Sequence, residues 1–184
     1  MVAVLEVDFD KAGTVNAPGT PDHAVANLRF NIEDTNDQDT NSPITIPAAG
    51  TNYSYWKHIF LHCTTAPSVS VNNVKIYSDG TLGWTGCTVK VGDDLCTKNS
   101  GSSAGYDPAV AAVVLTDHDT IVTTTSLFTF TSGAPRTCTI SEAGAIINAT
   151  GELTDYVVLD VEVGTTGVQG TQTAETITWQ YDEI

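Results

Sequence analysis

Helix-forming and basic residues are scarce in this sequence of 184 residues. It contains only 9 Leu, 5 Lys and 1 Met, and 7 Lys and Arg stand against 22 Asp and Glu, which gives a net charge of −15. The shortage of long helix formers argues against an α-helical protein. A surface this acidic repels phosphate and the anionic face of a membrane, so we expect neither nucleic acid nor a membrane as a partner.

Targeting and catalytic motifs are also missing. The chain begins MVAVLEVDFDKAG, without the basic and apolar segments of a secretory signal, so we expect synthesis in a host cytoplasm without export by that route. No run approaches the roughly 18 apolar residues of a membrane span. GxSxG, P-loop, GxGxxG and CxxC patterns are all lacking. We therefore expect a protein that is not an enzyme and has no organic cofactor.

The four cysteines lack the close spacing of a metal site. They are Cys63, Cys87, Cys96 and Cys138. In a chain made in a reducing cytoplasm, we expect four reduced residues that act as small core side chains. A disulfide between Cys87 and Cys96 across the turn at residues 92–94 is the alternative.

β-Branched residues dominate instead, with 29 Thr and 19 Val. Such residues fit a pleated, half-buried surface. Alternating apolar and polar side chains, separated by Gly, Asn, Asp and Pro, predict strands along the whole chain. The predicted strands are residues 3–10, 25–33, 43–47, 53–65, 74–78, 87–91, 110–115, 127–131, 136–140, 155–163 and 175–182.

Long connections separate several of these strands, at residues 34–42, 92–107, 141–154 and 164–174. Long crossings between short antiparallel strands favour a jelly-roll or Greek-key arrangement over simple hairpins. Residues 141–149 allow one helical turn at most. No repeat or linker divides the sequence. We therefore predict an all-β protein, an antiparallel β-sandwich of jelly-roll or Greek-key type, in which residues 1–184 form one domain.

His58 and His62 have the spacing of a metal-binding pair on a helix. The surrounding residues alternate as in a strand, where the two side chains share a face about 13 Å apart at roughly 3.3 Å per residue. One ion cannot bind both at that distance. We therefore expect no transition metal at His58, His62 or Cys63.

Acidic loops offer a second kind of metal site. Asp37, Asp39 and Asn41 repeat the first three oxygen positions of a calcium loop. Ser42 and Ala48 stand where an EF-hand has glycine and glutamate, so this is not an EF-hand. Calcium at these three residues is one interpretation, and a solvated turn whose side chains cap their own backbone is the other. The pairs at residues 93–94 and 117–119 allow the same two interpretations.

Two carboxylates share a strand face near the C-terminus. Asp160 and Glu162 lie about 6.6 Å apart along an extended backbone, a spacing that some glycosidases use. Laminarinase-type enzymes carry Glu-x-Asp-x-x-Glu on such a strand, but Val158 replaces the first acid and no acid stands at residue 163, the place of the last. We expect both side chains, and also Asp155, to lie on the solvent-facing, acidic surface of the C-terminal half.

Aromatic residues gather at Tyr53, Tyr55 and Trp56. Such a cluster can form a platform for a sugar ring, and it can equally well pack in the core or in a subunit contact. We include all three residues among the candidate interface residues.

Four segments of the chain carry a resemblance to known proteins. They are residues 26–31 (ANLRFN), 46–57 (IPAAGTNYSYWK), 73–80 (NVKIYSDG) and 175–183 (ETITWQYDE). Together they resemble small β-rich virion structural proteins of tailed phages, which decorate capsids or build tail appendages. The resemblance extends over most of the chain but contains no diagnostic motif, so it transfers no residue's role.

This resemblance implies a structural protein of the virion, most simply a capsid decoration (cement) protein. Such a protein assembles as a homo-oligomer and binds the major capsid protein or another virion protein. A carbohydrate-binding or adhesive tail-fibre module is the alternative. A third reading is a subunit of an extracellular filament joined by donated strands.

The two terminal strands have different expected roles. The first carries Leu5, Val7 and Phe9 on one side and is followed by a Gly- and Pro-rich segment at residues 11–23. We expect this strand to act as an arm that pairs with a neighbouring subunit. The last strand, residues 175–182, carries larger aromatic side chains and is expected to belong to the chain's own core.

Overall fold

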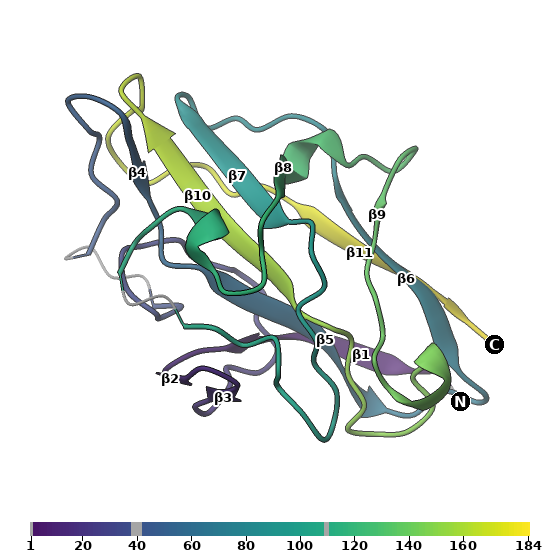
Figure 1. The fold of residues 1–184 in the computed structure, drawn as a ribbon. Coiled ribbons are helices and arrows are strands. Elements are labelled where there is room, and N and C mark those ends of the chain that lie inside the picture. The colour runs from purple at the N-terminus through teal and green to yellow at the C-terminus, as the bar shows by residue number, and fades with distance from the viewer. Residues whose placement is uncertain (1, 38–41, 109–110) are drawn as a thin grey trace.

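The computed structural model describes residues 2–37, 42–108 and 111–184 (Figure 1). The helical elements in these ranges are three-residue 3₁₀ turns, and no helix there is long and apolar enough to cross a membrane. The remaining elements are strands: β1 (Val4–Asp10), β2 (Gly13–Thr14), β3 (Ala17–Pro18), β4 (Thr51–Tyr53), β5 (Lys57–Thr65), β6 (Val71–Ser78), β7 (Cys87–Gly92), β8 (Thr124–Ser126), β9 (Arg136–Thr137), β10 (Val157–Gly164) and β11 (Ile177–Glu183).

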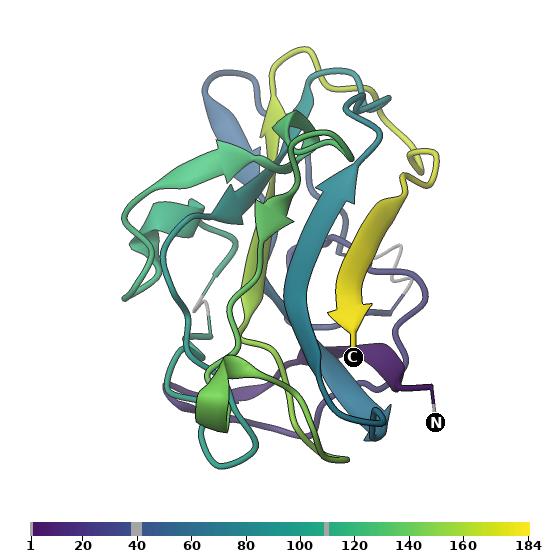
Figure 2. The same ribbon diagram turned by 90° about the vertical axis from the view of Figure 1, so that its right-hand side faces the viewer.

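Two antiparallel sheets form a sandwich, which confirms the predicted all-β fold class (Figure 2). The larger sheet has the order β1-β5-β10-β7-β8, and β4 also pairs with β10. The smaller sheet has the order β11-β6-β9, and β2 and β3 form a separate hairpin. The main core lies between the sheets, where Ile59 and Leu159 of the larger sheet belong to the same buried cluster as Val74 and Ile76 of the smaller one.

The outer face of the larger sheet is buried as well. Phe60 and Tyr156 point away from the main core and belong to a second buried cluster with Tyr106 and Leu115. These last two residues come from the long connection between β7 and β8, which contains the 3₁₀ turn η1 (Leu115–Asp117). Much of both faces of this sheet is therefore covered, so a polar side chain in the covered parts has to find a partner inside the protein.

This double burial corrects the expected position of two acids. Asp155 and Asp160 are almost fully buried, whereas Glu162 is half-buried. Asp155 accepts hydrogen bonds from the backbone N–H of Lys98 (2.8 Å) and the hydroxyl of Ser141 (2.9 Å). The expectation that all three acids face solvent was wrong, because loops cover the side of the sheet that alternation marks as polar.

Several predicted strands are absent or shorter. Residues 25–33 and 43–47 form no strand, although Phe30 and Ile44 pack against the main core. Their alternation reflects contact with the core without backbone pairing. Residues 111–114 are irregular, and the predicted strand at 136–140 shrinks to β9. The predicted strand at 53–65 is divided between β4 and β5.

Two predicted segments contain 3₁₀ turns. Residues 127–131 contain η2 (Leu127–Thr129), where the neighbouring side chains of Leu127 and Phe128 are both buried, an arrangement that an alternating strand does not allow. Residues 141–149 contain η3 (Ala143–Ala145), which agrees with the single predicted turn.

All four cysteines are free, as expected. Cys63, Cys96 and Cys138 are buried and Cys87 is half-buried. Burial raises the pKa of the Cys96 and Cys138 thiols to about 12, so neither is a reactive thiolate at neutral pH.

The predicted N-terminal arm is part of the domain. β1 pairs with β5 from Val4 to Asp10, and Phe9 is 0% exposed. The expectation of a detachable arm was therefore wrong, because β1 buries side chains on both of its faces. β11 is the more exposed of the two terminal strands, although its Trp179 packs against the main core as expected.

Candidate functional site

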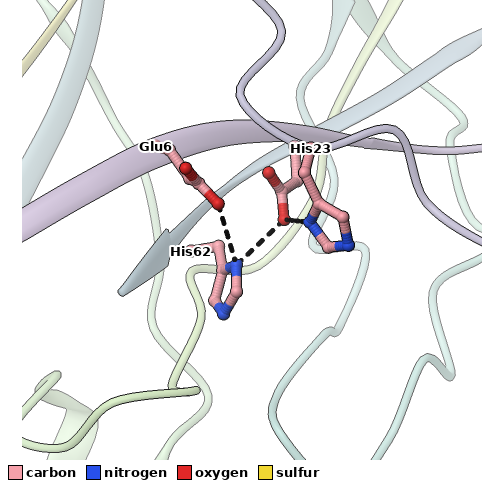
Figure 3. A group of neighbouring side chains, drawn as sticks. Glu6, His23 and His62 are labelled. Carbon is pink, nitrogen blue, oxygen red and sulfur yellow. Dashed lines mark hydrogen bonds and ion pairs between the residues drawn. The ribbon is translucent and has the colours of Figure 1, made fainter. Parts of the chain in front are cut away.

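Two histidines and two carboxylates meet on the outer face of the larger sheet (Figure 3). Glu6 and Asp8 lie on the same face of β1, and His62 of β5 is the pairing partner of Glu6. His23 comes from the segment that follows the β2–β3 hairpin. One ligand atom from each residue can be chosen so that all four lie within 4.8 Å of one another.

Backbone pairing holds His23 in place. The preceding residue, Asp22, exchanges two hydrogen bonds with Phe9, of 2.9 and 2.8 Å, so this segment lies along the outer edge of β1. The following residue, Ala24, has a φ of +52° and donates its N–H to Asp8 Oδ1 over 3.1 Å. The sheet and this added segment therefore fix the site from three neighbouring stretches of chain.

Asp8 is the centre of the group. Its Oδ2 lies 2.7 Å from Nδ1 of His23 and 3.0 Å from Nδ1 of His62. Glu6 Oε1 lies 3.6 Å from the same His62 nitrogen. Asp8 is buried, whereas the His23 side chain is 55% exposed, so the group opens to solvent on the His23 side.

The Nδ1 atom of His62 has no hydrogen-bond partner although it is buried. It lies close to two carboxylates but lacks hydrogen-bond alignment with both. Among the described residues, this is the one group of three or more His, Cys, Asp or Glu side chains with the proximity of a metal site. The sequence interpretation missed it because it compared His62 with His58 and not with its neighbour across the sheet.

His58 faces a different partner. Its Nε2 lies 3.2 Å from Nε2 of His118, inside the second buried cluster. Burial, strengthened by repulsion from His118 and two lysines, holds the pKa of His58 well below its usual value, and burial also lowers the pKa of His118. Both rings are therefore neutral at pH 7. His58 does not belong to the group that contains His62.

The calcium interpretation falls mostly outside the described residues. Asp39 and Asn41 are not among them, so of that trio the structure describes only Asp37. At the second acidic loop, Asp94 accepts backbone hydrogen bonds from Val122 (2.8 Å) and Thr123 (3.1 Å). This is the capping role that was the alternative to a calcium site there.

The candidate interface residues differ in exposure. Phe9 and Trp56 are 0% and 3% exposed, and the Trp56 indole donates to the carbonyl oxygen of Val113 over 2.9 Å. Neither is open to a partner, and for Trp56 the structure shows core packing, which was the alternative to a sugar platform. Leu5, Val7, Tyr53 and Tyr55 are half-buried.

Tyr53 lines a hollow on the surface. It has a volume of about 390 Å³, and its lining includes Asn52 and Asp117. Tyr55 does not line it. The hollow is open and combines an aromatic ring with an amide and a carboxylate.

Asp160 is enclosed within the protein. Its Oδ1 accepts hydrogen bonds from the backbone N–H and the hydroxyl of Ser54, over 3.2 and 2.9 Å, and its Oδ2 is buried without a partner. Burial raises the pKa of Asp160 from 3.8 to about 7, and the neighbouring Glu162 contributes to this rise. A carboxyl group without access to solvent cannot act with Glu162 on a glycan chain.

β11 forms one edge of the smaller sheet (Figure 2). Within the described part of the chain, it pairs with β6 on one side and with no strand on the other. The carbonyl oxygen of Val74 accepts from the N–H of Cys138, and the N–H of Ser78 donates to the carbonyl oxygen of Phe130. From Val74 to Ser78, the even-numbered residues of β6 therefore direct their backbone groups away from β11.

This pattern identifies the free backbone groups of β11. Alternate residues of a strand direct N–H and C=O to opposite neighbours, so Lys75 directs its groups to its β11 partner, Gln180. Gln180 therefore directs its own N–H and C=O groups toward Lys75. Ile177 and Trp179 are offset from Gln180 by an odd number of residues, so their N–H and C=O groups point to the unpaired side.

Searches against protein-family models, curated proteins and solved structures found no significant match for this chain.

Proposed function

We propose that this chain is a non-enzymatic structural protein of a virion, a capsid decoration protein that assembles as a homo-oligomer on the shell. The observation that carries the assembly role is the free edge of β11. Unpaired edges are a liability that proteins normally cover or shorten, and β11 carries neither a lysine nor a proline. The virion setting rests on the resemblance of the sequence to phage structural proteins.

A second copy of the chain is the proposed partner of this edge. Two β11 strands related by a two-fold axis pair antiparallel, and centring the pair on Trp179 places Ile177 opposite Tyr181. The same register places Asp182 opposite Thr176 and Glu183 opposite Glu175, so the like-charged pairs lie at the two ends of the ladder. Backbone pairing of this kind needs little complementarity between side chains, which suits two strongly acidic copies.

The end of the sandwich where the chain termini meet is the proposed contact with the shell (Figure 1). The backbone N–H of Ala3 donates to Glu183 Oε1 over 2.8 Å, and Ser70 exchanges two backbone hydrogen bonds with Ile184. Val69 and Ile184 are 64% and 62% exposed there, large values for apolar side chains. Burial of such side chains stabilises association through the hydrophobic effect.

Substitution of Ile177 tests the edge contact. Ile177→Pro removes an N–H on the free side and leaves the bonds to β6 in place, while Ile177→Ala loses similar packing but keeps the N–H. We expect sedimentation-equilibrium measurements to show a weaker oligomer for Ile177→Pro than for Ile177→Ala, with similar thermal melting. Equal association of the two variants, or a monomeric wild type, would contradict the proposed edge contact.

Particle composition tests the virion setting. Mass spectrometry of gradient-purified particles from a phage that encodes this chain should find it in a fixed ratio to the major capsid protein. The variant Val69→Asn/Ile184→Asn should bind shells that lack the protein more weakly than wild type does, with an unchanged oligomeric state. Trace or absent protein in the particles would refute the virion role.

The hollow beside Tyr53 favours a second candidate, a carbohydrate-binding module. Aromatic rings stack on sugar faces, and amide and carboxylate groups such as those of Asn52 and Asp117 bind hydroxyls. Glycan-array binding that Tyr53→Ala abolishes and Tyr55→Ala preserves would support this function. Absence of binding to bacterial surface polysaccharides would exclude it.

A further inference from the structure

We propose that Glu6, Asp8, His23 and His62 bind one divalent transition-metal ion, for which Zn²⁺ is the probe of choice. The ion would fasten the segment that carries His23 to β1 and β5. This site is independent of the proposed assembly function.

The donor set defines the class of metal. Two imidazole nitrogens and two carboxylates suit Zn²⁺ and its neighbours in the first transition row, whereas Ca²⁺ takes roughly six to eight oxygens. Four protein donors complete a tetrahedral shell, which is typical of a structural site without an open catalytic position. We therefore assign the ion a stabilising role.

The distances need adjustment in both directions, because the four ligand atoms lie within 4.8 Å of one another and some pairs are closer than a metal shell allows. Zinc bonds to nitrogen and oxygen of about 2.0–2.2 Å place tetrahedral donor atoms about 3.4 Å apart. The Asp8 Oδ2 atom lies 2.7 Å from His23 Nδ1 and 3.0 Å from His62 Nδ1, and Glu6 Oε1 lies 3.6 Å from His62 Nδ1. The two nitrogens must therefore move away from Asp8 by a few tenths of an ångström or more. The exposed His23 side chain has room to move.

The environment of the His62 Nδ1 atom is the second observation. This atom is buried and lies 3.0 Å from the Asp8 carboxylate as an ion pair, but it makes no hydrogen bond, which is rare for a buried nitrogen in native proteins. An ion between His62, Asp8 and Glu6 supplies the missing partner, because the Nδ1 lone pair then coordinates it. Asp8 is already oriented for this role, since Ala24 N–H holds its Oδ1 and leaves Oδ2 facing both imidazoles.

The ion would close the outer edge of β1. Residues 22 and 25 already pair with this edge through three backbone hydrogen bonds. The hairpin segment between β1 and His23 is otherwise tied down by few buried side chains, since residues 12–17 are all exposed. A metal–ligand bond at His23 adds a strong constraint at the end of this segment. Loss of the ion should therefore loosen the hairpin segment before the sandwich unfolds.

Zinc titration of the full chain, first stripped with chelator and reduced, tests the proposal. Isothermal titration calorimetry should find one Zn²⁺ per chain, and cobalt substitution should give the visible absorption of a tetrahedral site. We expect His23→Gln, a change at a solvent-exposed ring, to weaken binding at least tenfold. His62→Gln should do the same, and zinc should raise the melting temperature of wild type but of neither variant.

Two controls make the result specific. Glu162→Gln alters a carboxylate on the same sheet outside the group and should leave zinc affinity unchanged. Cys87→Ser removes the most accessible thiol and should also leave it unchanged. The proposal fails if wild type does not bind zinc, if His23→Gln binds as tightly as wild type, or if Cys87→Ser abolishes binding.

Discussion

Substitution of Asp160 by asparagine should stabilise the protein at neutral pH. The carboxyl group is 0% exposed, and burial raises its pKa from 3.8 to about 7. The folded state therefore holds a proton on Asp160 more tightly than the unfolded state does. The contribution of Asp160 to stability is greatest below about pH 4 and declines as the pH rises through 7.

The size of this loss follows from the shift. One pKa unit corresponds to about 1.4 kcal/mol, so the ionised carboxylate costs the folded state about 4 kcal/mol above pH 7. The amide introduced by Asp160→Asn keeps an oxygen for the two hydrogen bonds from Ser54 but places an N–H₂ group where Oδ2 has no partner, which costs about 1 kcal/mol. The net gain expected for Asp160→Asn at pH 8 is about 3 kcal/mol.

Urea unfolding at several pH values measures this gain. The difference between Asp160→Asn and wild type should shrink steadily from pH 8 to pH 5 and disappear or change sign near pH 4. Asp79→Asn, at an exposed acid, is the matched control and should change stability little at any pH. A gain that does not vary with pH, or a variant less stable than wild type at pH 8, would refute the assignment of a buried, strained carboxyl group.

Three further predictions concern the two faces of β1 and the second buried cluster. In an Asp160→Asn background, the unfolding free energy should fall as the pH drops below 6.5, because His58 and His118 stay neutral in the folded state but take up protons when the chain unfolds. His118→Gln should reduce this dependence of the unfolding free energy on pH in the same urea titrations. Lys98→Met should lower stability by about 3 kcal/mol or more in chemical denaturation, because Lys98 Nζ lies 2.8 Å from the buried Asp10 carboxylate; a smaller loss would mean that Asp10 finds another partner. Deletion of residues 1–10 should abolish cooperative unfolding by circular dichroism, and a folded truncation would restore the arm interpretation.

The fold class could be predicted from the sequence because it depends on local properties. β-Branched residues and period-two alternation mark a strand wherever it pairs, and β6, β10 and β11 lie within two or three residues of their predicted positions. The errors occur where alternation arises without pairing, as around Phe30 and Ile44, whose side chains contact the core from irregular backbone. Alternation reports contact with an apolar surface and not the hydrogen bonds that define a sheet.

The candidate metal site could not be predicted from spacing along the chain. Glu6 and Asp8 show the i, i+2 pattern of one strand face, but the pattern is common on solvated strands. The information that gives it meaning is the register that places His62 opposite Glu6 and the return of residues 22–25 along β1. Both are long-range features set by the packing of β1, and a search for helical His pairs pointed instead to His58.

The burial of acids on the larger sheet depends on residues far away in sequence. Asp10 is polar by alternation and should face water on a sheet with one covered face. Here the connection between β7 and β8 covers that face, so Asp10 contacts Lys98 and the hydroxyl of Tyr156. No local pattern records whether a loop some 90 residues away folds back over a strand.

The two strands at the chain ends differ in whether their outer edges are covered, and this difference supports the choice of β11 as the proposed assembly edge. The outer edge of β1 is covered by the segment that ends in His23, and an ion at the adjacent side chains would hold this cover in place. β11 has no such cover among the described residues, and Ile177 and Trp179 direct their backbone groups outward. A strand edge that is protected against pairing with other chains typically carries a charged residue or a proline at such positions. A protein that closes one terminal edge and leaves the other open can add a neighbour at β11 without domain swapping through β1. The oligomer should therefore lose its contacts on Ile177→Pro while zinc binding at the β1 edge stays intact.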